Sequence, residues 1–221
     1  MAVTCLCGMQ WGDEGKGRIV DLLAAKSDLV VRYQGGANAG HTVVVGETKY
    51  VVHLLPSGVI QPDTINIIGN GVVVDPWKVL EEIDGLVAKG IDLEGRLLIS
   101  DRAHLVLPHH KRMDEAFEAL RGDEKLGTTS RGIGPAYGDK ARRTGLRMAD
   151  LRRPEDCAPK LEKSLSAWNA ILDRAGMAPV DVQGAVTELK EIAGRLAPYV
   201  ADTTAVLLDE HAPLSCLRLR V

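Results

Sequence analysis

Short β-rich runs alternate with helical patterns along most of the 221 residues, and this alternation restricts the fold more than any other feature. Extended runs are expected at residues 3–7, 29–33 and 65–68, with a helical pattern after the first and third. Parallel strands need crossover connections, which helices usually supply. The predicted fold class is therefore α/β, with a central and mostly parallel sheet flanked by helices.

The remaining elements are expected from turn residues and apolar periodicity. Asp75 suits the N-cap of a helix, Pro76 its first position and Gly90 its end. Residues 122–145 have no hydrophobic period, so we expect an irregular segment there that is functional or mobile. The other expected elements are a hairpin of 42–45 with 49–54, helices over 16–25, 75–89, 111–121, 155–174 and 182–199, and extended runs over 96–100 and 104–107.

Composition and charge exclude several classes of partner. The net charge is −3, which gives no reason to expect a nucleic acid or a membrane surface as partner. No run of about 18 apolar residues and no basic leader is present, so we expect neither a membrane span nor a signal peptide. Cys5, Cys7, Cys157 and Cys216 do not make a disulfide framework, and buried free thiols fit a cytoplasmic protein.

Residues 8–17 (GMQWGDEGKG) form a Gly-rich turn between an expected strand and an expected helix. Glycines let backbone amides approach phosphate, the helix N-terminus favours anions, and Lys16 can neutralise phosphate oxygens. The loop departs from the Walker A pattern, because Gln10 replaces its first Gly and Gly17 replaces its Ser or Thr. Asp13 could then be a metal ligand, a proton acceptor or both. The alternative is a Gly-rich surface turn with solvated acids.

A second loop, residues 34–42 (QGGANAGHT), follows the second expected strand. Loops at the carboxyl ends of adjacent parallel strands meet in one crevice, which would bring His41 close to Asp13. An Asp base and a His acid suit a reaction that removes one proton and stabilises charge elsewhere. Gln34 and Asn38 could read polar edges of a ligand, whereas His41 could also be only a loop histidine. The pair at 109–110 lacks metal-ligand spacing nearby and is expected to be structural or solvated.

Five motifs together resemble the adenylosuccinate synthetase family. They are QWGDEGKG at 10–17, QGGANAGHT at 34–42, HLLPSG at 53–58, IGNGVV at 68–73 and GTTSRGIGPAY at 127–137. The resemblance covers residues 3–150 most strongly. It implies a P-loop-NTPase-like α/β fold, incomplete relative to the family, in a single domain. We divide that domain into a nucleotide- and IMP-phosphate-binding part (1–150), a helical segment (151–211) and a divergent tail (212–221).

The resemblance implies a GTP-dependent ligase that joins IMP to L-aspartate in AMP biosynthesis, giving adenylosuccinate, GDP and phosphate. Asp13 would remove the N1 proton of IMP, so that O6 attacks the GTP γ-phosphate. His41 would act as the acid, and Lys16 would complete the catalytic set. Mg²⁺ would be held by the Asp13 carboxylate and the Gly40 carbonyl, beside phosphate oxygens.

The family's binding residues carry over to this chain position by position. GTP would be bound by Gly12, Asp13, Glu14, Gly15, Lys16, Gly17, Arg18, Gly40, His41 and Thr42. IMP would be bound by Asp13, Glu14, Gly15, Lys16, Asn38, Ala39, Gly40, His41, Thr129 and Arg143. Arg143 would reach across a homodimer to the neighbour's IMP phosphate. A basic cluster of Lys140, Arg142, Arg143 and Arg147 suits an anion, although it could be a solvated face.

The tail at 212–221 departs from the family, whose members continue there into a strand and a Gly-rich IMP loop. A frameshift product or a truncated gene would explain such residues. Without the family's guanine and aspartate motifs, this chain alone is expected to be poorly active or inactive, and prone to aggregate. Two alternatives remain: a catalytically inactive fragment, and a P-loop-like GTP hydrolase without ligase activity.

Overall fold

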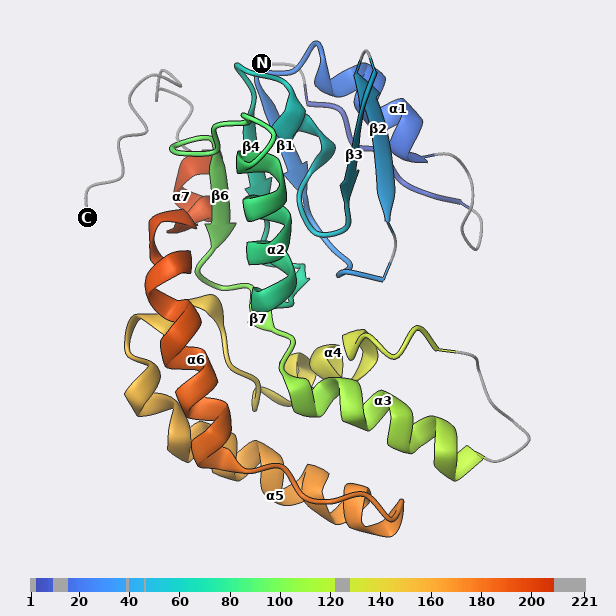
Figure 1. Ribbon diagram of the computed structural model, residues 1–221, viewed down its shortest axis with the longest axis vertical. Helices are drawn as coiled ribbons and strands as arrows, with labels where there is room; N and C mark the ends of the chain where they lie inside the picture. Colours follow the sequence, from blue (N-terminus) through green and yellow to red (C-terminus); the bar gives the residue numbers. More distant parts are fainter. Residues whose placement is uncertain (1–2, 10–15, 39, 46, 122–127, 209–221) are drawn as a thin grey trace.

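A four-stranded sheet forms the centre of the computed structural model, which describes residues 3–9, 16–38, 40–45, 47–121 and 128–208. Its strand order is β1-β4-β6-β8, and every neighbouring pair is parallel. Figure 1 shows the sheet in the upper part of the molecule, with α2 in front of it. The prediction of a mostly parallel sheet is therefore confirmed. The strands are β1 (Leu29–Arg32), β4 (Ile65–Ile68), β6 (Leu97–Ser100) and β8 (Val200–Ala201).

Two smaller sheets complete the β-structure. Strands β2 (His41–Val45) and β3 (Thr48–Val52) form the expected antiparallel hairpin, in which His41 is opposite Val52. Strands β5 (Val73–Val74) and β7 (His104–Leu105) pair in parallel. The hairpin begins at His41, so the polar second loop leads directly into a strand that fixes the position of this residue.

Helices α1 and α2 match their predicted bounds within two residues, whereas α5 begins and α6 ends three residues inside the predicted range, and α7 was not predicted. In α2 (Pro76–Val87) the Asp75 carboxylate accepts the Lys78 N–H at 3.1 Å, and Gly90 adopts a φ of +81° just beyond the helix. Helix α3 (Pro108–Arg121) begins three residues earlier than expected. The other helices are α1 (Lys16–Ala24), α5 (Ala158–Arg174), α6 (Val182–Leu196) and α7 (Thr203–Leu208), with 3₁₀ turns η1 (Ser57–Ile60), η3 (Met148–Arg152), η4 (Pro154–Cys157) and η5 (Ala197–Tyr199).

The expectation of an irregular segment over 122–145 is wrong for its second half, where α4 (Ile133–Arg142) forms. Local pattern hides this helix because only a few apolar residues mark it. Ala136 is fully buried, and Ile133 and Tyr137 pack with it against Val73 and Val106. Tertiary packing therefore stabilises a helix that sequence periodicity does not reveal. Residues 122–127 lie outside the described part.

The expected strand at 3–7 is also wrong, because residues 3–9 have no strand in this structure. Val3 and Met9 are almost fully exposed. A strand is stable only when its backbone N–H and C=O groups pair with a neighbour. Tyr33 Oη donates to the Leu6 carbonyl at 3.3 Å, which holds this N-terminal segment beside the end of β1 without a ladder.

The main core lies between one face of the sheet and the helices α2 and α6. Ile68, Leu97 and Ile99 contribute from the sheet, and the cluster continues down to Leu161 and Leu165 of α5. A much smaller cluster lies on alternate sheet positions, where Ile65, Ile67 and Leu98 pack with Ala201. The two sheet faces are thus covered unequally. Among the described helices, none combines the length and apolarity that crossing a lipid bilayer requires.

Candidate functional site

The first turn of α1 and the start of β2 meet at the end of the Gly-rich turn. A Cβ built on Gly17 would lie 2.3 Å from His41 Cε1, so the imidazole ring occupies the space that a side chain would need. The structure thus brings together the end of the predicted phosphate loop and the predicted acid. Five predicted site residues lie outside the described part, so their placement stays untested: Gly12, Asp13, Glu14, Gly15 and Ala39.

His41 is held by a carboxylate that sequence reasoning missed. Its Nε2 lies 2.9 Å from both Oδ1 and Oδ2 of Asp21, and both side chains are about a quarter exposed. Asp21 lies one helical turn after Gly17, on the same face of α1. The sequence signal for this contact is the i, i+4 spacing of Gly17 and Asp21. If Gly17 faces His41, the residue four positions later faces it too.

The remaining predicted ligand contacts near this point are solvent-facing. Lys16 and Arg18 are exposed in the first turn of α1, where backbone N–H groups have no partner within the helix. Asn38, Gly40 and Thr42 are exposed around His41. The described part of the site is therefore an open surface that presents a helix N-terminus, two basic residues and polar loop groups.

Partly buried polar side chains hold the backbone of the second loop. The Arg32 guanidinium donates to the carbonyl of Gly36 at 2.6 Å and to that of His53, and burial lowers the pKa of Arg32. Tyr137 Oη accepts the Gly35 N–H at 2.8 Å and donates to the Gly71 carbonyl at 2.8 Å. These bonds join the loop to β1, to residue 71 and to α4, so its backbone is held from several elements.

Gly40 is contacted by the side chain of the residue that directly follows β3. A Cβ on Gly40 would lie 2.9 Å from His53 Nε2, so His53 packs directly on this backbone. The other ring nitrogen of His53 is 3.6 Å from the Glu82 carboxylate, which is buried and accepts the N–H groups of Leu54 and Leu55 at 3.1 Å. Glu82 of α2 thereby holds the backbone just after β3 in place, and with it the His53 side chain that contacts Gly40.

The predicted basic cluster is divided among different partners. Lys140 donates to the Asn70 carbonyl, and the Arg142 guanidinium stacks 4.7 Å above the Trp168 ring. Arg143 ends α4 with a φ of +63° and is exposed, as is Thr129. Within the described residues, no hydrogen bond or ion pair joins Thr129 or Arg143 to Gly17 or His41. The structure therefore does not gather these four positions into one contact network.

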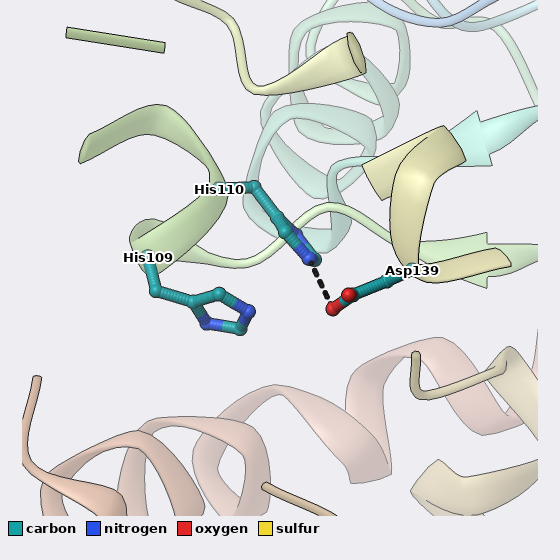
Figure 2. A group of neighbouring side chains, drawn as sticks. All are labelled: His109, His110 and Asp139. Carbon is teal, nitrogen blue, oxygen red and sulfur yellow. Dashed lines mark hydrogen bonds and ion pairs between the residues drawn. The ribbon is translucent and has the colours of Figure 1, made fainter. Parts of the chain in front are cut away.

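A second polar cluster lies between α3, α4 and α5 (Figure 2). The buried Asp139 carboxylate accepts from His110 Nε2 at 3.1 Å, Ser164 Oγ at 2.8 Å, Trp168 Nε1 at 3.0 Å and Thr144 Oγ1 at 3.0 Å. Burial alone would raise the pKa of Asp139, but the bonds from His110, Ser164 and Trp168 outweigh it and hold this pKa well below its ordinary value. The carboxylate therefore stays charged and ties three helices together.

The donor atoms of His109, His110 and Asp139 lie within 4.8 Å of one another, close enough to consider a metal ion. The hydrogen bonds argue against one. His110 Nδ1 accepts the Leu107 N–H at 2.9 Å, so its proton is on Nε2, where it is donated to Asp139. A ring used in this way has no lone pair left for a metal. The cluster is a structural junction, so of the two alternatives expected for 109–110, structural or solvated, the buried one is observed.

The fold and the site together define an α/β protein in which the first turn of α1 meets the start of β2. The adenylosuccinate synthetase family model matches residues 5–213. The chain is 51% identical over 208 residues to adenylosuccinate synthetase of Frankia alni, covering 94% of this chain and 48% of that protein. It is 51% identical over 211 residues to the Moorella thermoacetica enzyme, with the same coverage of both chains. The chain belongs to the adenylosuccinate synthetase family.

A solved structure gives the same assignment. The fully ligated adenylosuccinate synthetase of Plasmodium falciparum superposes with a TM-score of 0.78 at 36% identity. The match covers 90% of this chain and 46% of the Plasmodium chain. The chain thus spans about half the length of the relatives it matches, which agrees with the expectation of an incomplete, P-loop-like α/β fold.

Proposed function

We propose that this chain provides the phosphate and IMP end of an adenylosuccinate synthetase site, in which GTP drives the joining of IMP to L-aspartate. One observation carries the proposal. The His41 ring packs on Gly17 in the first turn of α1, so the proposed acid of the second loop contacts the last residue of the Gly-rich turn. A phosphate bound at this helix N-terminus would lie next to the imidazole.

The described residues suit distinct parts of the reaction. Lys16 and Arg18 supply positive charge where phosphate oxygens would lie, and His41 supplies a proton donor for charge that develops during phosphoryl transfer. Asp21 orients the imidazole by accepting from Nε2, which leaves Nδ1 turned toward α1. Asp13 would complete the pair as the base that removes the N1 proton of IMP.

Mg²⁺ belongs to the same proposal, with Asp13 and Gly40 as ligands. The Gly40 position suits a carbonyl ligand, because His53 fixes its backbone from one side and leaves the residue exposed on the other. A carboxylate and a carbonyl are oxygen ligands of the type that Mg²⁺ prefers. When bound, the ion would neutralise charge on the phosphate oxygens of GTP.

The IMP contacts of Thr129 and Arg143 are also proposed, the latter across a homodimer. Lys140 is engaged by Asn70 and Arg142 by Trp168, whereas among the described residues no hydrogen bond or ion pair engages the exposed Arg143 side chain at this helix end. A guanidinium held there by a fixed helix terminus suits a phosphate monoester. A cytoplasmic location completes the proposal, since Cys5, Cys7 and Cys157 are free thiols. Burial was expected for these thiols, but Cys5 and Cys7 are exposed and Cys157 is buried.

The test uses a hybrid in which residues 1–208 of this chain continue into the C-terminal half of the Moorella thermoacetica relative. Phosphate release is measured with GTP, Mg²⁺, IMP and aspartate, and each is omitted in turn. The proposal predicts release that needs all four components and falls about 10²- to 10⁴-fold in His41→Asn. Release without IMP would indicate a GTP hydrolase instead, and no release under any condition would indicate an inactive fragment.

A further inference from the structure

Cys5 and Cys7 bring two thiols into contact on the N-terminal segment 3–9. Their Sγ atoms are 3.6 Å apart, and both side chains are exposed. Side chains two positions apart in an extended chain point to the same side, which places the two sulfurs next to each other. The proposed function uses neither thiol, so the pair is a separate group of nucleophiles at the surface.

The two sulfurs need only a small movement to form a disulfide. An S–S bond is about 2.05 Å long, so the sulfurs must approach each other by about 1.5 Å. The Cα–Cα separation in a disulfide is usually below about 6.8 Å, whereas two steps of a fully extended chain span about 6.6–7.2 Å. The backbone must therefore shorten slightly. Residues 3–9 form no strand, so within the described residues no ladder of backbone hydrogen bonds resists that change.

Tyr33, just beyond β1, contacts the second thiol. Its Oη lies 3.8 Å from Cys7 Sγ and donates to the Leu6 carbonyl at 3.3 Å. Hydrogen bonding to Cys7 raises the pKa of both Cys5 and Tyr33, so these two groups keep their protons. A thiolate, rather than a thiol, is the nucleophile in disulfide exchange. Cys7 is therefore suited to attack a disulfide first, and Cys5 to react second.

Cys157 has the opposite character. It is buried at the end of η4, and its Sγ donates to the Asp150 carbonyl at 3.7 Å. Burial raises the pKa of this thiol to about 11. A buried thiol that keeps its proton is inert toward disulfides. Among the three described cysteines, Cys157 is thus an internal reference against which the exposed pair can be compared.

We propose that Cys5 and Cys7 form a redox-active dithiol, which low-molecular-weight disulfides such as oxidised glutathione convert into an intramolecular disulfide. The Cys7 thiolate attacks one sulfur of the glutathione disulfide, and one glutathione thiolate leaves. Cys5 then loses its proton to solvent and attacks Cys7 Sγ in the mixed disulfide, and the second glutathione thiolate leaves.

The exchange balances without any other reactant. The two cysteines lose two electrons and two protons, and the glutathione disulfide takes up both to become two thiols. Disulfides that form in cytoplasmic proteins are usually transient and redox-sensing, which agrees with an exposed and reversible pair. This inference depends on the contact between the two sulfurs and not on the proposed ligase activity, so either can fail without the other.

The test is oxidation of the folded 221-residue chain in mixtures of reduced and oxidised glutathione. Samples are quenched with acid, alkylated in denaturant, digested with trypsin and analysed by mass spectrometry. Trypsin releases peptide 1–16, which contains Cys5, Cys7 and no other cysteine. We expect this peptide to lose two hydrogens and both alkylation sites together, roughly 10-fold faster than Cys157 becomes glutathionylated.

Single substitutions separate the roles of the two thiols. Cys5→Ser keeps the attacking thiol, so it should accumulate a mixed disulfide with glutathione and form no ring. Cys7→Ser keeps only the second thiol and should form its mixed disulfide roughly 10-fold more slowly. Cys216→Ser is the matched control, because it leaves the pair intact and should not change ring formation. Circular dichroism of each variant checks that its fold is retained.

Three results would overturn the proposal. The unsubstituted chain stops at mixed disulfides, or the pair links two chains instead of closing, or the ring forms no more readily in the folded chain than in the chain unfolded in urea. The last result would mean that neighbouring positions in the sequence, and not the fold, bring the sulfurs together. The proposal predicts an equilibrium constant for ring formation against glutathione that is about 10-fold larger in the folded chain.

Discussion

His41 and Gly17 are in such close contact that a Cβ at residue 17 would stand 2.1 Å from His41 Nδ1. Real Cβ atoms do not approach ring atoms so closely, so only glycine fits opposite this imidazole. The contact with His41 therefore explains why residue 17 is Gly where the Walker A pattern has Ser or Thr. Its missing side chain makes room for the ring rather than for a ligand.

Gly17→Ala should displace the His41 ring and break its bond to Asp21. The added helix propensity is worth at most about 1 kcal/mol, so it will not compensate for the clash. The expected result is a shifted His41 ring signal in NMR together with a lower or unchanged melting temperature. Gly85→Ala in α2 is the matched control, because nothing lies within 4 Å of its Cβ, and it should stabilise by about 0.5–1 kcal/mol. An unmoved His41 signal in Gly17→Ala would contradict the close contact.

Local sequence pattern was sufficient to predict the elements that are bounded by clear capping or turn residues. Asp75 and Pro76 begin α2, Gly90 follows its end, and the apolar run 65–68 is a buried parallel strand. Pattern failed where stability comes from distant residues. Helix α4 depends on contacts with Val73 and Val106, and residues 3–7 cannot form a strand without a neighbour to pair with.

For the candidate site, the sequence predicted the loop residues proposed to contact ligand but not the side chains that hold those residues in place. Glycines, Lys16 and His41 follow from phosphate chemistry and from the resemblance, but the side chains that hold them do not. Asp21 looks like an ordinary acid on a surface helix, and Glu82 like one on the polar side of α2. Their roles depend on which loops they reach in space, which the sequence alone does not specify.

Asp139→Ala should be among the most destabilising single substitutions in the chain. It leaves three buried donors without an acceptor, on His110, Ser164 and Trp168, and a partly buried one on Thr144. We expect a loss of about 3–5 kcal/mol in the free energy of unfolding, measured by urea titration with circular dichroism. Asp173→Ala, at an exposed position of α5, should change it by less than about 0.5 kcal/mol. Similar values for the two variants would refute the role of Asp139 as a junction.

Stability should fall between pH 8 and pH 5 because of His109. Burial, with a smaller contribution from His110, lowers the pKa of His109 to about 3 from an ordinary 6.5. Below pH 6.5 His109 becomes protonated in the unfolded chain but stays neutral in the folded chain. The free energy of unfolding therefore falls as the pH drops toward 3. The expected loss from this group is about 2 kcal/mol at pH 5.

His109→Leu isolates this contribution. Both ring nitrogens of His109 are buried without a hydrogen-bond partner among the described residues, so an apolar side chain should also stabilise the protein at pH 8 by about 1–3 kcal/mol. Urea titrations at several pH values measure both effects. A residual slope is expected from His104, whose pKa burial lowers to about 4. An unchanged slope in His109→Leu would assign the acid sensitivity to other groups.

Glu82→Gln should loosen the backbone that supports Gly40. The Glu82 carboxylate accepts the N–H groups of Leu54 and Leu55, and an amide would turn a donor toward one of them. We expect a loss of about 1–3 kcal/mol in unfolding free energy and faster hydrogen exchange at both leucine amides. Glu81→Gln, one residue earlier and exposed, should change neither by a measurable amount. Equal exchange rates in the two variants would contradict the role of Glu82 in holding residues 53–55.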